Sequence, residues 1–240
     1  MDHAASVTCA GFYVTGTDTG VGKTCVTLAL LAALQLSGKS AVGFKPVASG
    51  CIRDGEAWHN ADALDLQRAS VPTPAYALVN PMALPDATAP QIAAAAAGIT
   101  VSLPPLVAAF SQLALLADSV VVEGVGGWLA PLADDLEQAQ LAAALGLPVI
   151  MVVGIKLGCL SHARLTERAI LQDGFPLAGW IGSSVDPHLD FAEPYEDLLR
   201  RYLSSPCLGV LPHQAATHDA RAWAVLLRVP GIAADTPGRM

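Results

Sequence analysis

The feature that most constrains this chain is a glycine-rich segment close to its N-terminus. Residues 15–24 read TGTDTGVGKT; they follow a hydrophobic run at 11–15 and open a helix-like segment that begins at Lys23. Glycines in such a turn let backbone N–H groups approach phosphate oxygens, the lysine can reach the terminal phosphates, and the next hydroxyl can bind Mg²⁺. Five residues separate Gly16 from Gly22, one more than in the usual pattern. The segment predicts a long variant of a phosphate-binding loop; a glycine-rich turn into an ordinary helix is the alternative.

The rest of the sequence fits a parallel sheet around such a loop. Short, almost continuous hydrophobic runs predict strands that are covered on both faces, at 11–15, 41–45, 119–123, 148–153, 177–181 and 207–211. Helix-like segments alternate with them at 23–36, 62–68, 87–97, 106–117, 136–145, 160–172 and 191–203. The alternation predicts one α/β domain over residues 1–240, with a doubly wound, mostly parallel sheet and helices on both faces. The proline-rich stretch 71–90 predicts an extended loop, and residues 229–240 predict a loosely attached tail.

Composition and absent motifs exclude several classes of protein. The formal net charge is −8 with no basic stripe, which argues against a nucleic-acid or membrane-surface partner. Five scattered cysteines indicate free thiols in a reducing compartment, and no hydrophobic stretch reaches the roughly 18 residues of a membrane span. The sequence contains neither the H-E-x-x-H pattern of many zinc enzymes nor the G-x-S-x-G pattern of many serine hydrolases. We therefore expect a soluble, cytoplasmic protein whose partners are small molecules or other proteins.

Two charged residues lie where a parallel sheet would gather ligands, at the carboxyl ends of its strands, and a third lies at the start of a helix that follows one of these strands. Lys45 ends the second predicted strand, in the sequence KPVASG, and could place positive charge beside a transferring phosphate; the alternative is a solvated cation. Glu123 ends a hydrophobic strand before GVGG, where an acid can hold Mg²⁺; it could also simply face water. Asp62 begins the helix after the second strand and is a second candidate for the same ion, or only a helix cap.

Taken together, these segments resemble the dethiobiotin synthetase family. The matching stretches are VTGTDTGVGKT (14–24), GFKPVASG (43–50), NADALDLQR (60–68), VVEGVGGWLAPL (121–132), LPVIMVVGIKLGCLSHA (147–163) and LAGW (177–180). The resemblance implies that 7,8-diaminononanoate (7,8-diaminopelargonate) reacts with CO₂ to a carbamate, that ATP phosphorylates the carbamate to a carbamic–phosphoric anhydride, and that the second amine closes a cyclic urea. Dethiobiotin, ADP and phosphate would be the products, with Mg²⁺ as the metal.

The resemblance also implies roles for individual residues. Lys45, Lys23 and Thr19 would act in catalysis, with Thr19 beside the carbamate. Thr24, Asp62 and Glu123 would hold Mg²⁺. The residues implied to contact ATP are Gly20, Val21, Gly22, Lys23, Thr24, Cys25, Asp62, Glu123, Gly124, Val125, Gly126, Ser183, Ser184, Pro212, His213 and Gln214. Those implied to contact the organic substrate are Ser49, Thr19, Ser161 and Tyr195.

Members of the family are similar in being homodimers whose substrate lies across the subunit interface. The segment 154–161 and Tyr195 would then come from the partner subunit. Two positions depart from the family pattern, which usually has asparagine where Ser161 stands and an Asn-Asp pair at Ser183 and Ser184. A single hydroxyl at Ser183 cannot make the two-point contact that an asparagine makes with adenine.

Two other classes share the phosphate-binding loop. A dimerising switch ATPase that positions protein or DNA on a surface would also carry a basic patch or an amphipathic membrane helix, and it has no need for KPVASG. The ATP-binding part of a cobyrinate-type amide synthetase would require an additional glutaminase domain, for which 240 residues leave no room.

Overall fold

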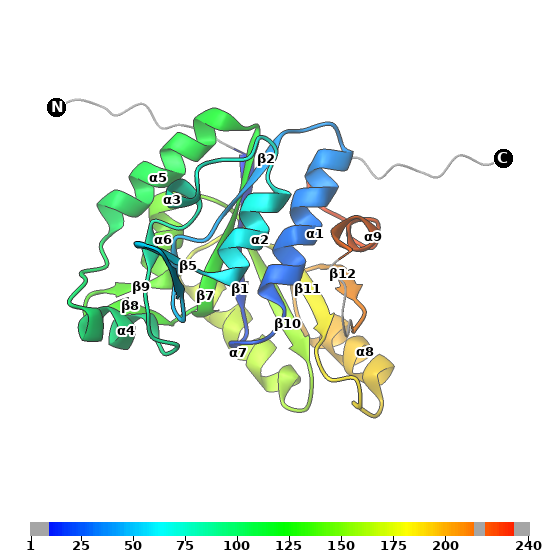
Figure 1. Cartoon of the computed structure of the whole chain (residues 1–240). Helices are drawn as coiled ribbons and strands as arrows, with labels where there is room; N and C mark the ends of the chain where they lie inside the picture. The colour runs from blue at the N-terminus through cyan, green and yellow to red at the C-terminus, as the bar shows by residue number, and fades with distance from the viewer. Residues whose placement is uncertain (1–9, 214–218, 233–240) are drawn as a thin grey trace.

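The central element of the computed structural model, which describes residues 10–213 and 219–232, is a six-stranded sheet (Figure 1). Its strands are β1 (Ala10–Gly16), β2 (Ala41–Phe44), β7 (Ser119–Gly127), β10 (Val149–Ile155), β11 (Leu177–Ser184) and β12 (Cys207–Leu211). The order is β12-β11-β10-β1-β7-β2, and every neighbouring pair is parallel. The predicted α/β fold with a mostly parallel sheet is therefore confirmed, and each predicted strand lies in this sheet.

Helices cover both faces of the sheet. One face packs against α1 (Lys23–Leu36), α2 (Ala61–Ala69) and α9 (Ala220–Ala224). The other packs against α5 (Leu103–Leu116), α6 (Gln138–Leu145), α7 (Cys159–Gln172) and α8 (Ala192–Tyr202). Within β1, Tyr13 belongs to the second core while Phe12 and Val14 belong to the first, because successive side chains alternate across a strand. This double burial explains why the strands are continuous hydrophobic runs; each fully buried leucine, such as Leu30 or Leu113, contributes about 1.5–3 kcal/mol.

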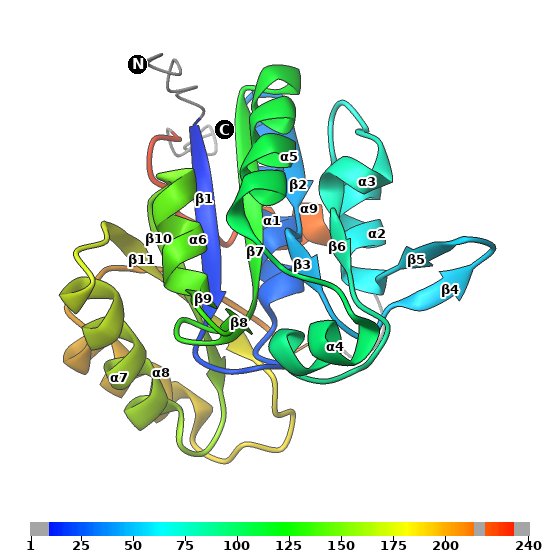
Figure 2. The ribbon, with the colours of Figure 1, turned by 90° about the vertical axis from the view of Figure 1, so that its left-hand side faces the viewer.

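The smaller elements surround the carboxyl edge of the sheet. A two-stranded hairpin of β4 (Ile52–Asp54) and β5 (Ala57–His59) projects from the body of the protein (Figure 2). β8 (Pro131–Ala133) pairs with β9 (Leu136–Glu137), and α4 (Pro90–Ala97) lies beside β8.

The predicted extended loop at 71–90 is wrong in part. It contains α3 (Tyr76–Val79) and β6 (Met82–Ala83), and β6 pairs in parallel with β3 (Val47–Ala48), which begins two residues after Lys45. A four-residue helix and a two-residue strand are too short to show a hydrophobic period, so the prolines dominate the sequence pattern.

Three predicted helix starts are also wrong. The helix predicted from 106 begins three residues earlier, at Leu103, because the prolines that follow fit the first turn of a helix. The helix predicted from 87 begins at Pro90, which occupies the first turn where its missing N–H has no effect. The helix predicted from 136 begins at Gln138, because Leu136 and Glu137 form β9 and Glu137 makes a capping box with Gln140.

The C-terminal segment is packed at its start. The side chain of Val229 is buried, and Ile232 packs against the same core, so the predicted loose tail does not begin at 229. Residues 233–240 of that predicted tail lie outside the described part of the chain. Over residues 10–213 and 219–232, no helix is both long and hydrophobic enough to span a bilayer.

Candidate active site

The predicted phosphate-binding loop connects β1 to α1. Gly22 precedes the helix with φ of 88°, in the left-handed region that favours glycine. A Cβ atom at Gly22 would lie only 2.3 Å from Ser183 Oγ, so the close approach of β11 also requires glycine here. No side chain caps α1, so its first N–H groups are available to an anionic ligand.

Lys23 is buried at the end of this loop. Its Nζ atom donates a hydrogen bond to the backbone carbonyl of Asp18, at 2.8 Å. Burial, together with the nearby positive charge of Lys45, lowers the pKa of Lys23 to about 8. An anion bound beside Lys23 would favour the charged form of the lysine and compete with the Asp18 carbonyl for its protons.

Asp18, in the middle of the longer loop, contacts residues inside and outside this loop. One carboxylate oxygen accepts the N–H of Thr19 at 2.7 Å, and the other lies 3.3 Å from Lys156 Nζ on the segment after β10. The hydrogen bond from the Thr19 N–H and the charge of Lys156 hold the pKa of Asp18 below its ordinary value, against a smaller effect of burial. The loop is thus linked to the segment that connects β10 to α7.

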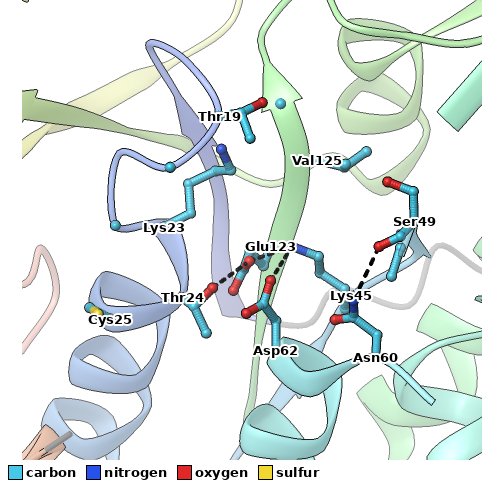
Figure 3. A pocket seen from close by; sticks show the side chains of 14 residues that line it. Thr19, Lys23, Thr24, Cys25, Lys45, Ser49, Asn60, Asp62, Glu123 and Val125 are labelled. Carbon is cyan, nitrogen blue, oxygen red and sulfur yellow. Dashed lines mark hydrogen bonds and ion pairs between the residues drawn. The ribbon is translucent and has the colours of Figure 1, made fainter. Parts of the chain in front are cut away.

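A second group of charges converges from three elements opposite the loop (Figure 3). Lys45 Nζ donates to Glu123 Oε1 and lies 3.6 Å from Asp62 Oδ2. Thr24 Oγ1 donates to the same Glu123 oxygen at 3.0 Å. Burial alone would lower the pKa of Lys45, but the carboxylates of Glu123 and Asp62 outweigh it and raise that pKa above its ordinary value. Lys45 therefore stays charged in an almost fully buried position.

Glu123 is incompletely satisfied. Its side chain is 1% exposed, and in the described part of the chain its second oxygen, Oε2, has no hydrogen-bond partner. A buried acceptor without a donor is costly and calls for a ligand or an ion. Thr24, Asp62 and Glu123 together present hydroxyl and carboxylate oxygens, the donor set that suits Mg²⁺. Within the described ranges no three His, Cys, Asp or Glu side chains form a metal cluster, so a magnesium ion here would need phosphate oxygens and water as well.

These groups line one cavity of about 430 Å³. Most of the predicted site residues meet there: Thr19, Gly20, Gly22, Lys23, Thr24, Cys25, Lys45, Ser49, Asp62, Glu123, Val125 and Gly126. Two further residues that were not predicted as site residues, Ala48 and Asn60, also line the cavity. Asn60 caps α2 through its Oδ1 atom, and its Nδ2 atom lies 3.4 Å from the Ser49 carbonyl. An asparagine before a helix is a recognisable cap, but its second contact is tertiary and has no sequence signal.

Two of the predicted ATP contacts, Val21 and Gly124, are not among the residues that line the cavity. The Val21 side chain is fully buried in the core against Gly154, which leaves only its backbone for a ligand. A Cβ atom at Gly124 would lie 2.9 Å from Gln138 Oε1 and 3.2 Å from the Tyr13 hydroxyl. Glycine at position 124 therefore lets β7 pack against these two buried side chains.

The predicted base-binding residues lie at the ends of β11 and β12. Ser183 is buried against the start of α1, and His213 Nδ1 lies 3.0 Å from the Ser184 carbonyl. Pro212 directly follows β12, whereas Gln214 lies outside the described residues.

The two predicted substrate contacts that depend on a partner subunit lie on α7 and α8. Ser161 is exposed and Tyr195 is half-buried, and both are outside the cavity in this chain.

β7 continues to Gly127, so Glu123 lies within this strand and not at its end as predicted. A glycine loop between a central parallel strand and a helix, with lysine, threonine and a carboxylate of the neighbouring strand around one cavity, defines a P-loop nucleotide-binding protein. The family described as "AAA domain" matches residues 10–221.

Sequence relatives specify the family further. The ATP-dependent dethiobiotin synthetase BioD of Xanthomonas oryzae pv. oryzae (strain PXO99A) is 54% identical over 91% of this chain and 97% of its own. The enzyme of the same name from Xylella fastidiosa (strain 9a5c) is 57% identical over 85% of this chain and 90% of its own. The chain belongs to the ATP-dependent dethiobiotin synthetase family, whose members are ATP-dependent ligases.

Solved structures of other proteins share the fold. A ParA family ATPase from Chlorobium tepidum TLS aligns with a TM-score of 0.50 at 16% identity, over 87% of this chain and 86% of its own. The MinC:MinD cell division protein complex of Aquifex aeolicus aligns with a TM-score of 0.51 at 13% identity, over 90% of this chain and 86% of the matched one. At this level of identity the likeness concerns the fold alone.

Proposed function

We propose that this protein converts 7,8-diaminononanoate and CO₂ to dethiobiotin, with ATP and Mg²⁺, through a carbamate and a carbamic–phosphoric anhydride. One amine adds to CO₂ and loses a proton, and the carbamate oxygen then takes the γ-phosphoryl group of ATP. The second amine attacks the carbonyl carbon, expels phosphate and closes the cyclic urea. The observation that carries the proposal is the single cavity in which Lys23 and the glycine loop lie opposite Lys45, Glu123 and Asp62.

Phosphoryl transfer between two anions depends on positioning and on neutralising charge. The N–H groups of 20–25 and Lys23 would hold the β- and γ-phosphates. Lys23 would leave the Asp18 carbonyl, to which it now donates, and bind phosphate oxygen instead.

Lys45 is the proposed catalytic lysine. It is charged, buried and fixed by two carboxylates, so its direction is set before the substrate enters. It would face the carbamate oxygen as this oxygen approaches the γ-phosphate. Ser49 and Thr19, which line the same cavity, would contact the diamine and the carbamate.

The free oxygen of Glu123 supports a magnesium site formed with Thr24 and Asp62. When bound there, Mg²⁺ would supply positive charge to the phosphates during transfer. Lys45 contacts both carboxylates of this proposed site, Glu123 and Asp62.

We also propose a homodimer in which 154–161 and Tyr195 of one subunit complete the substrate site of the other. Leu157 and Leu165, which lie before and within α7, are 80% and 61% exposed, as suits a surface that a second copy covers. Gly158 has φ of 92°, so a valine there would strain the start of α7. Mixing inactive Lys45→Ala with inactive Gly158→Val should restore part of the activity; verified mixed dimers without activity would contradict a shared site.

The first test of the reaction is whether ATP turnover depends on the organic substrates. We expect ADP release to require both 7,8-diaminononanoate and bicarbonate, because the phosphate acceptor forms only from both. ATP hydrolysis that is unchanged when either is left out would favour a switch ATPase instead.

A further inference from the structure

The segment predicted as an extended loop contains groups that hold Lys45 in place. The backbone N–H of Lys45 donates to the Val79 carbonyl at 2.8 Å, and the Lys45 carbonyl accepts from Asn80 Nδ2 at 2.7 Å. Asn80 is 3% exposed. The backbone of Lys45, which directly follows β2, is therefore held at both its N–H and its carbonyl group by α3 and the residue that follows α3.

The same network continues to α2. The Tyr76 hydroxyl donates to Asn80 Oδ1 at 3.0 Å and accepts the backbone N–H of Asn60 at 2.8 Å. Asn60 is the N-cap of α2, and Asp62 lies in the first turn of that helix. A single hydroxyl thus connects the backbone of Lys45 with the start of the helix that carries its partner carboxylate.

The directions of these hydrogen bonds are mutually consistent. Because the Tyr76 oxygen accepts from Asn60, its own proton is free to bond the oxygen of the Asn80 amide. That contact orients the amide so that its NH₂ group faces the Lys45 carbonyl. The Tyr76 ring also makes an edge contact with His59, 4.5 Å between ring centroids, which holds the hydroxyl at this point. Burial raises the pKa of Tyr76, so the hydroxyl keeps its proton.

We propose that Tyr76 and Asn80 are positioning residues that set the distance between Lys45 and Asp62. The proposal rests on the proposed function of Lys45 and Asp62, but neither Tyr76 nor Asn80 lines the cavity or touches the substrate. Their effect on catalysis would arise only through the 3.6 Å separation of Lys45 Nζ and Asp62 Oδ2.

The test is Tyr76→Phe, which removes the hydroxyl and keeps the ring against His59. Tyr202→Phe is the matched control, because Tyr202 is 49% exposed on α8 and phenylalanine keeps its ring beside Arg164 and Arg201. We expect kcat to fall about 3- to 10-fold in Tyr76→Phe, the range of one lost hydrogen bond, with KM for ATP changed less than about 2-fold. Asn80→Ser should likewise lower kcat and leave KM for ATP nearly unchanged. The double variant should lose no more kcat than the more strongly affected of the two single variants, because both residues act through the same chain of hydrogen bonds.

A binding measurement separates this inference from the proposed reaction. ADP binding is measured at increasing Mg²⁺ concentrations. We expect Tyr76→Phe to raise the Mg²⁺ concentration that gives half-maximal ADP binding about 2- to 5-fold, because the start of α2 loses its hydrogen bond to the Tyr76 hydroxyl. A variant that loses thermal stability but matches Tyr202→Phe in both kcat and Mg²⁺ dependence would overturn the positioning role. If wild type shows no diamine-dependent turnover, the proposed function fails, while the Mg²⁺ titration still decides the role of Tyr76.

Discussion

Two buried glutamates of this protein have opposite surroundings. Glu167 on α7 is 5% exposed, and both of its oxygens are used. They accept the N–H groups of Ser204 and Ser205 at 2.9–3.1 Å and the Ser205 hydroxyl at 2.6 Å. Glu123 is 1% exposed, and one oxygen is shared by Lys45 and Thr24 while the other has no partner in the described part of the chain.

The difference separates a structural carboxylate from a functional one. At Glu167, hydrogen bonds from Ser205 and Ser204 outweigh the effect of burial and lower the pKa of the carboxyl below its usual value. This carboxylate joins α7 to the segment before β12 and needs nothing more. At Glu123 the protein leaves an acceptor unsatisfied at the edge of the cavity, which is costly unless a ligand completes it. Both glutamates are buried and carry a carboxylate, so the feature that distinguishes them is the carboxylate oxygen of Glu123 that has no hydrogen-bond partner in the described part of the chain.

The largest expected effect comes from removing the cation that pairs with Glu123. Lys45→Ala should lower turnover about 10²- to 10³-fold, as for other positioned charges that act in a transition state. Steady-state assays measure this, with Lys39→Ala outside the cavity as the control. Because Lys45→Ala also leaves a buried carboxylate unpaired, the variant Lys45→Met with Glu123→Gln should regain stability but not activity. Turnover within about tenfold of wild type would remove Lys45 from the catalytic role.

The free oxygen of Glu123 predicts a weaker hold on magnesium in its amide variant. Glu123→Gln and Asp62→Asn should each raise the half-saturating Mg²⁺ concentration about tenfold or more, because an amide is a poorer ligand for a hard cation. Magnesium titrations of turnover measure the change. Glu167→Gln should leave the magnesium dependence unchanged, and an equal shift in all three variants would abolish the distinction between the two glutamates.

The satisfied glutamate should act on stability. Glu167→Gln is expected to lower the free energy of unfolding by about 1–3 kcal/mol, because an amide cannot accept all four contacts. Denaturant unfolding at pH 7 measures this, and kcat of the folded variant should stay near that of wild type.

The same variant has a predicted pH dependence. The pKa of Glu167 is lower in the folded protein than its ordinary value, so the carboxylate stabilises the fold above the unfolded pKa and loses this effect as the pH falls through the folded pKa. The difference in stability between wild type and Glu167→Gln should therefore shrink on acidification. A difference that grows toward low pH would contradict the role of the ionised carboxylate.

The smallest effect is expected at the base-binding end of the site. Ser183 offers one hydroxyl, which is buried against the start of α1. We therefore expect wild type to prefer ATP over CTP, GTP or UTP less strongly, in kcat/KM, than a relative with asparagine at this position. Ser183→Asn should raise the preference for ATP about 5-fold or more, through a two-point contact with adenine. Ratios of kcat/KM for the four nucleotides measure this; a strong preference for ATP that Ser183→Asn leaves unchanged would mean that the base is recognised elsewhere.

Much of this arrangement could be predicted from the sequence, and the exceptions have physical reasons. The sheet follows from short, continuous hydrophobic runs such as 148–153, because strands covered on both faces have that pattern and the runs are too short for buried helices. Lys45 and Glu123 could be placed in one site because the carboxyl ends of parallel strands meet at one edge. Their contact with each other, and the free oxygen of Glu123, depend on packing that no local pattern records.

The residues around the site were harder to predict for the same reason. Tyr76 and Asn80 lie in a proline-rich stretch whose elements span only a few residues, so neither helix nor strand periodicity is visible there. Their hydrogen bonds reach Asn60 and Lys45, across 16 and 35 positions of sequence. Asn60 is recognisable as a helix cap, but only the folded chain brings it beside Ser49.

The most direct test of the account follows the carbon that becomes the urea. The protein is incubated with ¹³C-bicarbonate, 7,8-diaminononanoate, ATP and Mg²⁺, and the labelled ring carbonyl and released phosphate are measured together. We predict equal amounts of labelled dethiobiotin and phosphate for wild type and for Glu167→Gln, and neither product above background for Lys45→Ala. Phosphate release without labelled dethiobiotin in wild type, or undiminished label in Lys45→Ala, would contradict the assignment of this cavity as the site of ring closure.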